Sequence, residues 1–225
     1  MSNYTKNFDE VLARVEAARL EADEYRIIKI IAASKYVDAK EIETMYKIGH
    51  RCFGENRVQD LKEKNEALLE YPLEWHFIGR LQSNKINQLL DINPFLIHSV
   101  ESLELAQEID KRAKTKGLKP NILLQINAAN EESKAGVSVD KAIDTYHDIA
   151  QNCTHLNLKG VMSIGAHTQD EKIVAKSFES TYAIFEKLQE AGAVHCSMGM
   201  SNDFELAIKC GSNMVRLGSL LFKEH

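Results

Sequence analysis

The feature that most constrains the fold is a regular alternation of short apolar runs with longer amphipathic stretches. The runs have the length and the residue types that are typical of buried strands. The eight candidate strands cover residues 27–34, 51–54, 75–79, 95–100, 121–127, 158–165, 193–198 and 213–217. No hairpin signal joins consecutive runs, so we expect parallel strands that are connected through helices.

The stretches between the runs have the 3.6-residue spacing of apolar positions that predicts helices. In one of them, Asp38 and Glu41 have the spacing of a capping box, and Gly49 follows its last apolar residue. The segment 63–70 is expected to be a solvated helix face. The helices predicted with explicit bounds cover residues 5–24, 38–48, 102–115, 171–191 and 203–210.

Eight strand–helix units in 225 residues fit an α/β fold of one particular kind, a single (β/α)8 TIM barrel with an extra N-terminal helix. An open doubly wound sheet is the main alternative, but it usually has a glycine-rich turn after its first strand. Here that turn reads SKYVDA, which favours the barrel. No Pro-, Gly- or Ser-rich linker interrupts the chain, so we expect a single domain over residues 1–225.

Composition and charge exclude several classes of function. Lys and Arg number 28 against 33 Asp and Glu, without a basic run, so we expect no nucleic-acid partner. No apolar stretch approaches the roughly 18 residues that span a bilayer, and the polar N-terminus does not resemble a signal peptide, so we expect no membrane association. Four widely spaced cysteines are typical of reduced thiols, which favours a cytoplasmic location. No HxxxH, HExxH or CxxC pairing is present, so no metal site is predicted.

In a (β/α)8 barrel the catalytic and ligand-binding residues lie at the carboxyl ends of the strands. Lys35 directly follows the first candidate strand, at the rim of an apolar barrel core. Such an amine is placed to act as a nucleophile that forms a Schiff base.

Small residues follow the last two candidate strands, in the segments SMGMSND and RLGS. Barrels commonly bind phosphate between these two loops, where backbone N–H groups and the start of a short helix approach the anion closely. Gly199, Ser201, Gly218 and Ser219 fit this role. A lysine facing a phosphate site predicts a phosphorylated carbonyl ligand, and both pyridoxal phosphate and a sugar phosphate qualify.

Other polar residues at strand ends carry weaker signals. Asn56 follows the second candidate strand. His76 lies between Trp75 and Phe77, so it fits a hydrogen-bonded core position as well as a pocket position.

Several segments together resemble the pyridoxal phosphate homeostasis protein family, whose members resemble the N-terminal barrel domain of alanine racemase. The resemblance covers about residues 27–222, in order and with short spacers. The segments are AASKYVDAKEI, GHRCFGENRVQDLKEK, EWHFIGRLQSNK, HSVES, SKAGV, LKGVMSIG and SMGMSNDFELAIKCGSNMVRLGSLLF.

The resemblance implies that pyridoxal phosphate is the cofactor and that Lys35 holds it as an aldimine. Arg216 would lie near the pyridine nitrogen, where its positive charge opposes protonation of the ring and weakens the electron sink. Two positions depart from the pattern of many members: Arg57 stands where a tyrosine is common, and Tyr36 where a small residue is common. The remaining cofactor-binding residues that the resemblance implies are Asn56, His76, Met200, Ser201, Gly218 and Ser219.

Three functions follow from these observations. The first is a cytoplasmic, monomeric carrier that takes part in pyridoxal phosphate homeostasis without robust turnover, has no catalytic residue, and has pyridoxal phosphate-dependent apo-enzymes as possible partners. The second is an amino-acid racemase of the alanine racemase type, which needs a second acid/base that a C-terminal β-domain supplies. The chain ends at His225, just past the eighth candidate strand, so we expect no such domain and favour the carrier. The third, a Schiff-base aldolase acting on a sugar phosphate, stays open from the residues alone.

Overall fold

Eight parallel strands form a closed barrel in the computed structural model, which describes residues 3–129, 131 and 135–223. Neighbouring strands follow the order β4-β3-β2-β1-β9-β8-β7-β5, and the pairing of β4 with β5 closes the sheet. A two-residue strand, β6, pairs in parallel with the last two residues of β5 and is not one of the eight barrel strands. The strands are β1 (Lys29–Ala33), β2 (Cys52–Glu55), β3 (Glu74–Phe77), β4 (Leu96–Val100), β5 (Asn121–Asn127), β6 (Val137–Ser138), β7 (Asn157–Ser163), β8 (His195–Met200) and β9 (Met214–Leu217).

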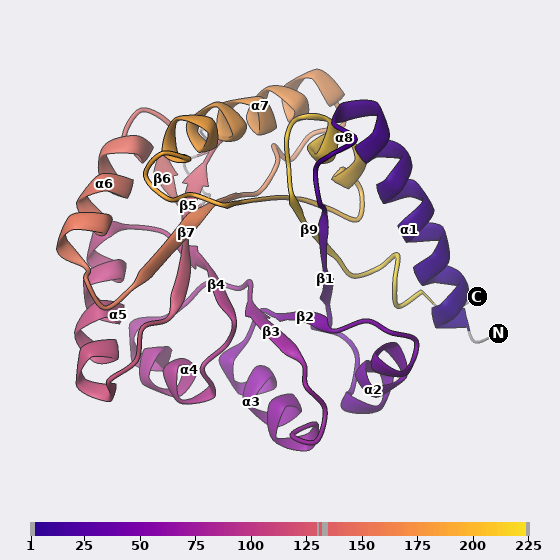
Figure 1. The fold of residues 1–225 in the computed structure, drawn as a ribbon, viewed down its shortest axis with the longest axis horizontal. Coiled ribbons are helices and arrows are strands. Elements are labelled where there is room, and N and C mark those ends of the chain that lie inside the picture. The colour runs from indigo at the N-terminus through magenta and orange to yellow at the C-terminus, as the bar shows by residue number, and fades with distance from the viewer. Residues whose placement is uncertain (1–2, 130, 132–134, 224–225) are drawn as a thin grey trace.

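Helices surround this barrel as an outer ring, and the chain begins and ends beside α1 (Figure 1). The ring exists because each parallel connection must cross back over the outer face of the sheet. The helices are α1 (Asn3–Ala22), α2 (Ala39–Lys47), α3 (Val58–Ala67), the 3-10 helix η1 (Ser83–Lys85), α4 (Ile86–Ile92), α5 (Leu103–Lys116), α6 (Ala142–Asn152), α7 (Glu171–Leu188) and α8 (Phe204–Lys209).

The predicted TIM barrel with an extra N-terminal helix is confirmed, and every predicted strand has a counterpart. Most predicted ends of helices and strands differ from the observed ends. For example, the first helix covers Asn3–Ala22 instead of 5–24. The capping box is present, since the Asp38 side chain accepts from the Glu41 N–H and the Glu41 side chain accepts from the Asp38 N–H. No helix was predicted with explicit bounds at α3, α4 or α6. Strand β6 has only two residues, which are too few to show a periodic pattern of apolar positions. Part of the SKAGV segment, residues 133–134, lies outside the described residues.

The core has two layers, because strands of a closed parallel barrel are buried on both faces. The larger cluster fills the space between the barrel and the helices, and it includes Phe53, Phe77 and Phe178. The smaller cluster lies inside the barrel and consists of Ile31, Leu96, Leu123, Met162 and Met214.

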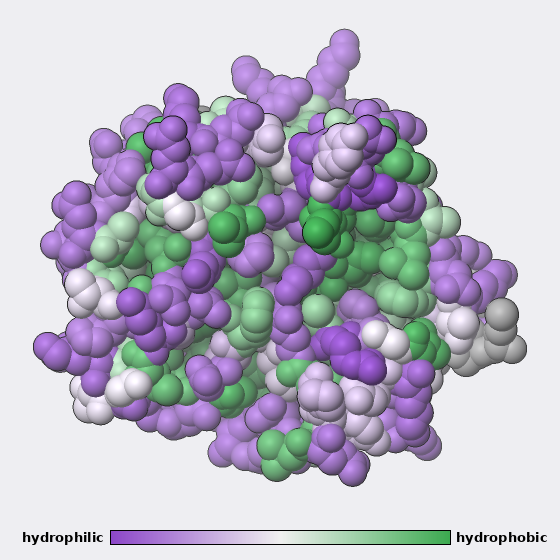
Figure 2. Space-filling view, in the orientation of Figure 1, coloured by the Kyte–Doolittle hydropathy of each residue, from purple (hydrophilic) through white to green (hydrophobic). Residues whose placement is uncertain are grey.

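The distribution of polar and apolar side chains on the surface is consistent with an apolar core covered by amphipathic helices. Figure 2 shows polar side chains around the edge of the molecule, with apolar side chains gathered toward the middle of the same face. Within the described part of the chain, no helix combines the length and the apolar character that crossing a membrane requires.

At Gly160 the barrel strands β7 and β8 approach each other closely. Gly160 pairs with His195 and has a φ of +142°, which side chains rarely adopt. A Cβ at this position would run into the carbonyl oxygen of His195. Only glycine therefore lets β7 and β8 pair here.

Gly160→Ala is expected to lower the free energy of unfolding by about 2 kcal/mol more than Gly192→Ala does. Gly192 also has a positive φ, +91°, but a Cβ there meets nothing within 4 Å, so it separates backbone strain from the steric clash. Urea unfolding of both variants measures the difference. Equal destabilisation would show that the close approach of the two strands does not constrain residue 160.

Candidate functional site

A cavity of about 1560 Å³ opens where the carboxyl ends of β1, β8 and β9 meet. Six of the eight residues predicted to bind a cofactor line this cavity: Lys35, Met200, Ser201, Arg216, Gly218 and Ser219. They come from distant parts of the sequence and meet because the strands are parallel and β1 pairs with β9.

Lys35 enters the cavity from the chain that leaves β1. It is exposed, and its Nζ lies 4.6 Å from the centroid of the Tyr36 ring, at cation–π distance. The Tyr36 side chain is 89% exposed, so the residue that departs from the family pattern stands at the open side of the cavity and not in the core.

The loops after β8 and β9 are joined to each other. The Gly218 N–H donates to Ser201 Oγ at 3.2 Å, and the Met200 N–H donates to the Asp203 carboxylate at 2.6 Å. Gly199 has a φ of +96°, and a Cβ there would lie 2.6 Å from the Cβ of Ala207. These contacts hold two hydroxyl-bearing, glycine-containing loops side by side, an arrangement that suits an anion.

Gly218 also packs closely against the first barrel strand. A Cβ at this position would lie 3.1 Å from the carbonyl oxygen of Ala33. The absence of a side chain at Gly218 therefore keeps the β9 loop against the end of β1, beside Lys35.

Arg216 is the buried cation of the site. Its Nη1 donates to Ser197 O at 2.9 Å and to Ser197 Oγ at 2.7 Å, and its Nη2 donates to Ser163 O at 2.9 Å. These bonds use three of the five N–H groups of a guanidinium, while the side chain also lines the cavity. Burial lowers the pKa of Arg216 to about 10, opposed by the Asp203 carboxyl, so the group stays charged at neutral pH.

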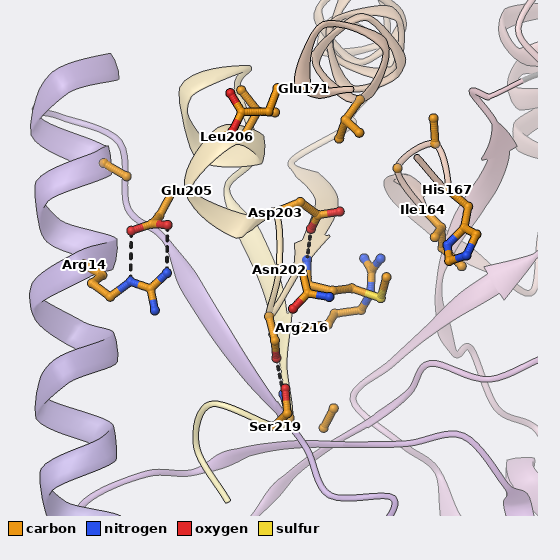
Figure 3. A pocket seen from close by; sticks show the side chains of 18 of the residues that line it. Arg14, Ile164, His167, Glu171, Asn202, Asp203, Glu205, Leu206, Arg216 and Ser219 are labelled. Carbon is orange, nitrogen blue, oxygen red and sulfur yellow. Dashed lines mark hydrogen bonds and ion pairs between the residues drawn. The ribbon is translucent and has the colours of Figure 1, made fainter. Parts of the chain in front are cut away.

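The N-terminal helix forms one wall of the cavity. In Figure 3, α1 with Arg14 stands on one side, and the loop with Ile164 and His167 stands on the other. Arg14 and Glu205 form an ion pair of 2.8 Å that connects α1 to α8. The sequence pattern predicted this helix but did not indicate that it borders the site.

The structure does not bring Asn56 and His76 to this cavity. Asn56 is exposed at the end of β2 and is not among the residues that line the cavity. His76 is completely buried inside the barrel, where Nε2 lies 2.8 Å from Glu74 Oε1 and Nδ1 lies 2.9 Å from Nε2 of His98. Of the two positions that the sequence allowed for His76, the structure shows the hydrogen-bonded core position. The His76 side chain points into the barrel, below the rim that borders the cavity.

One group of side chains within the described residues has atoms spaced like metal ligands. The ligand atoms of Cys52, Glu74 and His76 lie within 4.8 Å of one another. The Lys29 ammonium lies 2.5 Å from the same Glu74 oxygen that faces His76, so this carboxylate already has a cationic partner. The absence of a metal stays a prediction.

The donor set at the cavity fits a phosphorylated carbonyl compound. It combines an exposed primary amine, two serine hydroxyls, the backbone at Gly218 and a buried guanidinium that faces the same space. The phosphate site predicted from the loops after the last two barrel strands coincides with the β8 and β9 loops of this cavity.

Comparisons with known proteins agree with this chemistry. Residues 6–225 match the family model of the alanine racemase N-terminal domain. A protein from Helicobacter pylori named pyridoxal phosphate homeostasis protein is 49% identical over 224 residues, covering 100% of both chains.

Two solved structures have the same fold as this chain. A structure from Bifidobacterium adolescentis, described as an unknown protein, is 34% identical with a TM-score of 0.92, covering 97% of this chain and 94% of its own. PipY from Synechococcus elongatus, solved with PLP bound, is 27% identical with a TM-score of 0.83, covering 98% and 100%. By the match over its full length, this chain belongs to the pyridoxal phosphate homeostasis proteins, within the alanine racemase N-terminal domain family.

Proposed function

We propose that this chain binds pyridoxal phosphate in the cavity at the carboxyl ends of β1, β8 and β9 and takes part in its homeostasis. One observation carries the proposal: an amine, a pair of hydroxyl-bearing loops and a buried guanidinium converge on one cavity. The name of the Helicobacter pylori relative and the PLP bound in the PipY structure support it.

Each part of the cofactor has a matching group in this proposal. The Lys35 amine is the covalent attachment point for the aldehyde, and Ser201, Gly218 and Ser219 hold the phosphate, with Met200 beside them. Arg216, which lines the same cavity, would lie at the ring nitrogen. When bound, pyridoxal phosphate supplies an electron sink for chemistry at an amine carbon, and a guanidinium at the ring nitrogen weakens that sink.

The proposed role is that of a carrier, which a weakened electron sink favours over turnover. The protein holds the cofactor and releases it, and the proposed recipients are pyridoxal phosphate-dependent apo-enzymes. Contributions of Asn56 and His76 to binding, a single domain over residues 1–225, a monomeric state and a cytoplasmic location stay predictions.

Lys35→Ala is expected to abolish the visible absorption band of protein mixed with pyridoxal phosphate, because the amine needed for attachment is lost. Lys209→Ala is the matched control, since Lys209 lines the same cavity but forms a 2.6 Å ion pair with Glu21. Borohydride reduction followed by peptide mass analysis should locate the adduct on Lys35. An adduct on another lysine contradicts the assignment, and a colourless wild-type protein favours the aldolase alternative.

Ser201→Ala and Ser219→Ala are each expected to weaken pyridoxal phosphate binding about tenfold and to leave pyridoxal binding nearly unchanged. The reason is that a hydrogen bond to a charged group contributes about 1.5 kcal/mol or more. Thr168→Ala removes a hydroxyl from another part of the cavity wall and should affect neither ligand. Spectroscopic titration with both ligands tests this, and equal losses for both would argue against a phosphate site between these loops.

Racemase and transaminase activity are expected to stay at background in cofactor-loaded protein. Racemisation needs a second acid/base on the opposite face of the substrate carbon, and Arg216 opposes the ring protonation that favours a carbanion. A chiral assay against a panel of L-amino acids measures this. Turnover near the median enzyme rate of roughly 10 s⁻¹, lost in Lys35→Ala, would instead support the racemase alternative.

A further inference from the structure

A row of polar side chains runs through the interior of the barrel and ends at Arg216. Glu74 Oε1 lies 2.8 Å from His76 Nε2, and His76 Nδ1 lies 2.9 Å from His98 Nε2. His98 Nδ1 lies 3.1 Å from Ser197 Oγ, which accepts from Arg216 Nη1 at 2.7 Å. We call these five residues the axial row: Glu74, His76, His98, Ser197 and Arg216.

Strand alternation places the row inside the barrel. On β3, Glu74 and His76 share one face, whereas Trp75 and Phe77 belong to the cluster between barrel and helices. On β9, Arg216 shares its face with Met214, which belongs to the cluster inside the barrel. The row therefore connects opposite ends of β3 and β9 through the middle of the molecule.

The two ends of the row determine the direction of every hydrogen bond in it. A guanidinium only donates, and an ionised carboxylate only accepts. Although burial alone raises the pKa of the Glu74 carboxyl, hydrogen bonds from His76 and Lys29 hold it at about 2, so it is ionised at neutral pH.

Starting from the carboxylate, each neutral imidazole has one donor and one acceptor nitrogen. His76 must donate through Nε2 to Glu74, which leaves Nδ1 to accept from Nε2–H of His98. Nδ1 of His98 then accepts from the Ser197 hydroxyl, and Ser197 Oγ accepts from Arg216. All members are satisfied in one arrangement, and both histidines carry their proton on Nε2.

Burial favours the neutral form of both histidines. It lowers the pKa of His76, against the effect of Glu74, and it lowers the pKa of His98 well below the usual range. The titratable and charged groups that act on His98 are His76, Arg216, His195 and Lys29, and all four act in the same direction as burial. Neither imidazole therefore reverses its hydrogen bonds near neutral pH.

This hydrogen-bond arrangement fixes the orientation of the Arg216 guanidinium. Ser197 binds one side of the guanidinium through Oγ and its carbonyl, and Ser163 O binds Nη2, so the plane of the group is fixed. Because Ser197 Oγ must direct its proton to His98, it can only accept from Arg216. The donors of the row all point from the guanidinium toward the carboxylate, and this alignment favours the positive charge of Arg216.

The geometry points to His98 as a positioning residue that acts through Ser197 to hold Arg216 in one orientation toward the cofactor ring. Glu74, at the opposite end of the barrel, contributes to the electronic state of the bound cofactor through the same row. This inference rests on the proposed function for its link to the cofactor, but the hydrogen-bond arrangement of the row does not depend on it.

Histidine nitrogen NMR of the protein without added cofactor tests the row directly. Both His76 and His98 are expected to be neutral with the proton on Nε2, and unchanged between about pH 5 and 8. The variants His76→Gln and His98→Leu identify their signals. A proton on Nδ1 of either ring, or titration in this range, would overturn the row.

Visible spectroscopy of cofactor-loaded protein tests the coupling. His98→Leu is expected to change the absorption maximum of the bound cofactor and to weaken its binding about tenfold. Glu74→Gln keeps the shape but removes the charge, so it should shift the maximum in the same direction by less. His98→Gln, which keeps one donor and one acceptor, should restore part of the wild-type spectrum.

His50→Leu is the matched control for loss of a buried histidine. His50 is 7% exposed and lies 2.7 Å from the carbonyl oxygen of Cys52, outside the axial row. It should lower the thermal midpoint without changing the cofactor spectrum. If His98→Leu does not fold, the visible spectrum of cofactor-loaded Glu74→Gln tests the coupling in its place.

An unchanged spectrum and unchanged binding in the folded variants of the row would overturn the coupling. If the wild-type protein gives no visible band with pyridoxal phosphate, the proposed function fails and the coupling fails with it. The NMR result then still decides whether the row has the inferred arrangement.

Discussion

The pairing of the first and last barrel strands is the contact on which the rest of the structure depends. Ile31 pairs with Arg216 and Ala32 with Leu217 in parallel register. The chain that leaves β1 and the chain that leaves β9 therefore emerge side by side at one rim, although they come from opposite ends of the sequence. This pairing brings Lys35 to the cavity that Gly218 and Ser219 border, and together with the β4–β5 pairing it makes the eight barrel strands a closed sheet.

Part of the barrel interior is polar. An apolar layer that includes Ile31 and Leu123 fills part of it. The buried imidazoles of His76 and His98 and the buried Arg216 guanidinium occupy the same interior, and the partly exposed Glu74 carboxylate ends the row. Buried charges stabilise a fold only when every group has a partner, and an apolar replacement is often more stable. The axial row supplies those partners, from Glu74 to Arg216. Because an apolar replacement is often as stable, we attribute the row to the site at its Arg216 end and not to stability.

The periodic pattern of the sequence predicted more of the fold than of the site. It located every barrel strand to within a few residues, because period-2 and period-3.6 patterns are local properties of the chain. The strand-end rule selected Lys35, Ser201 and Gly218 correctly as members of one cavity. The same rule and the family resemblance together also selected Asn56 and His76, which lie elsewhere. The alternation of β3 was the available signal for His76, since it gives His76 and Glu74 the same inward face.

By itself, the sequence determined the fold class, the family and the side chains that stand at the ends of the strands. These follow from local patterns and motifs, which need no knowledge of the partner strands. Only the tertiary structure decided that His98, Ser197 and Arg216 form one hydrogen-bonded row and that α1 forms a wall of the cavity. The physical reason is that the stagger between neighbouring strands is set by the packing of the whole closed barrel. Residues that are far apart in the chain meet only after every strand has taken its place.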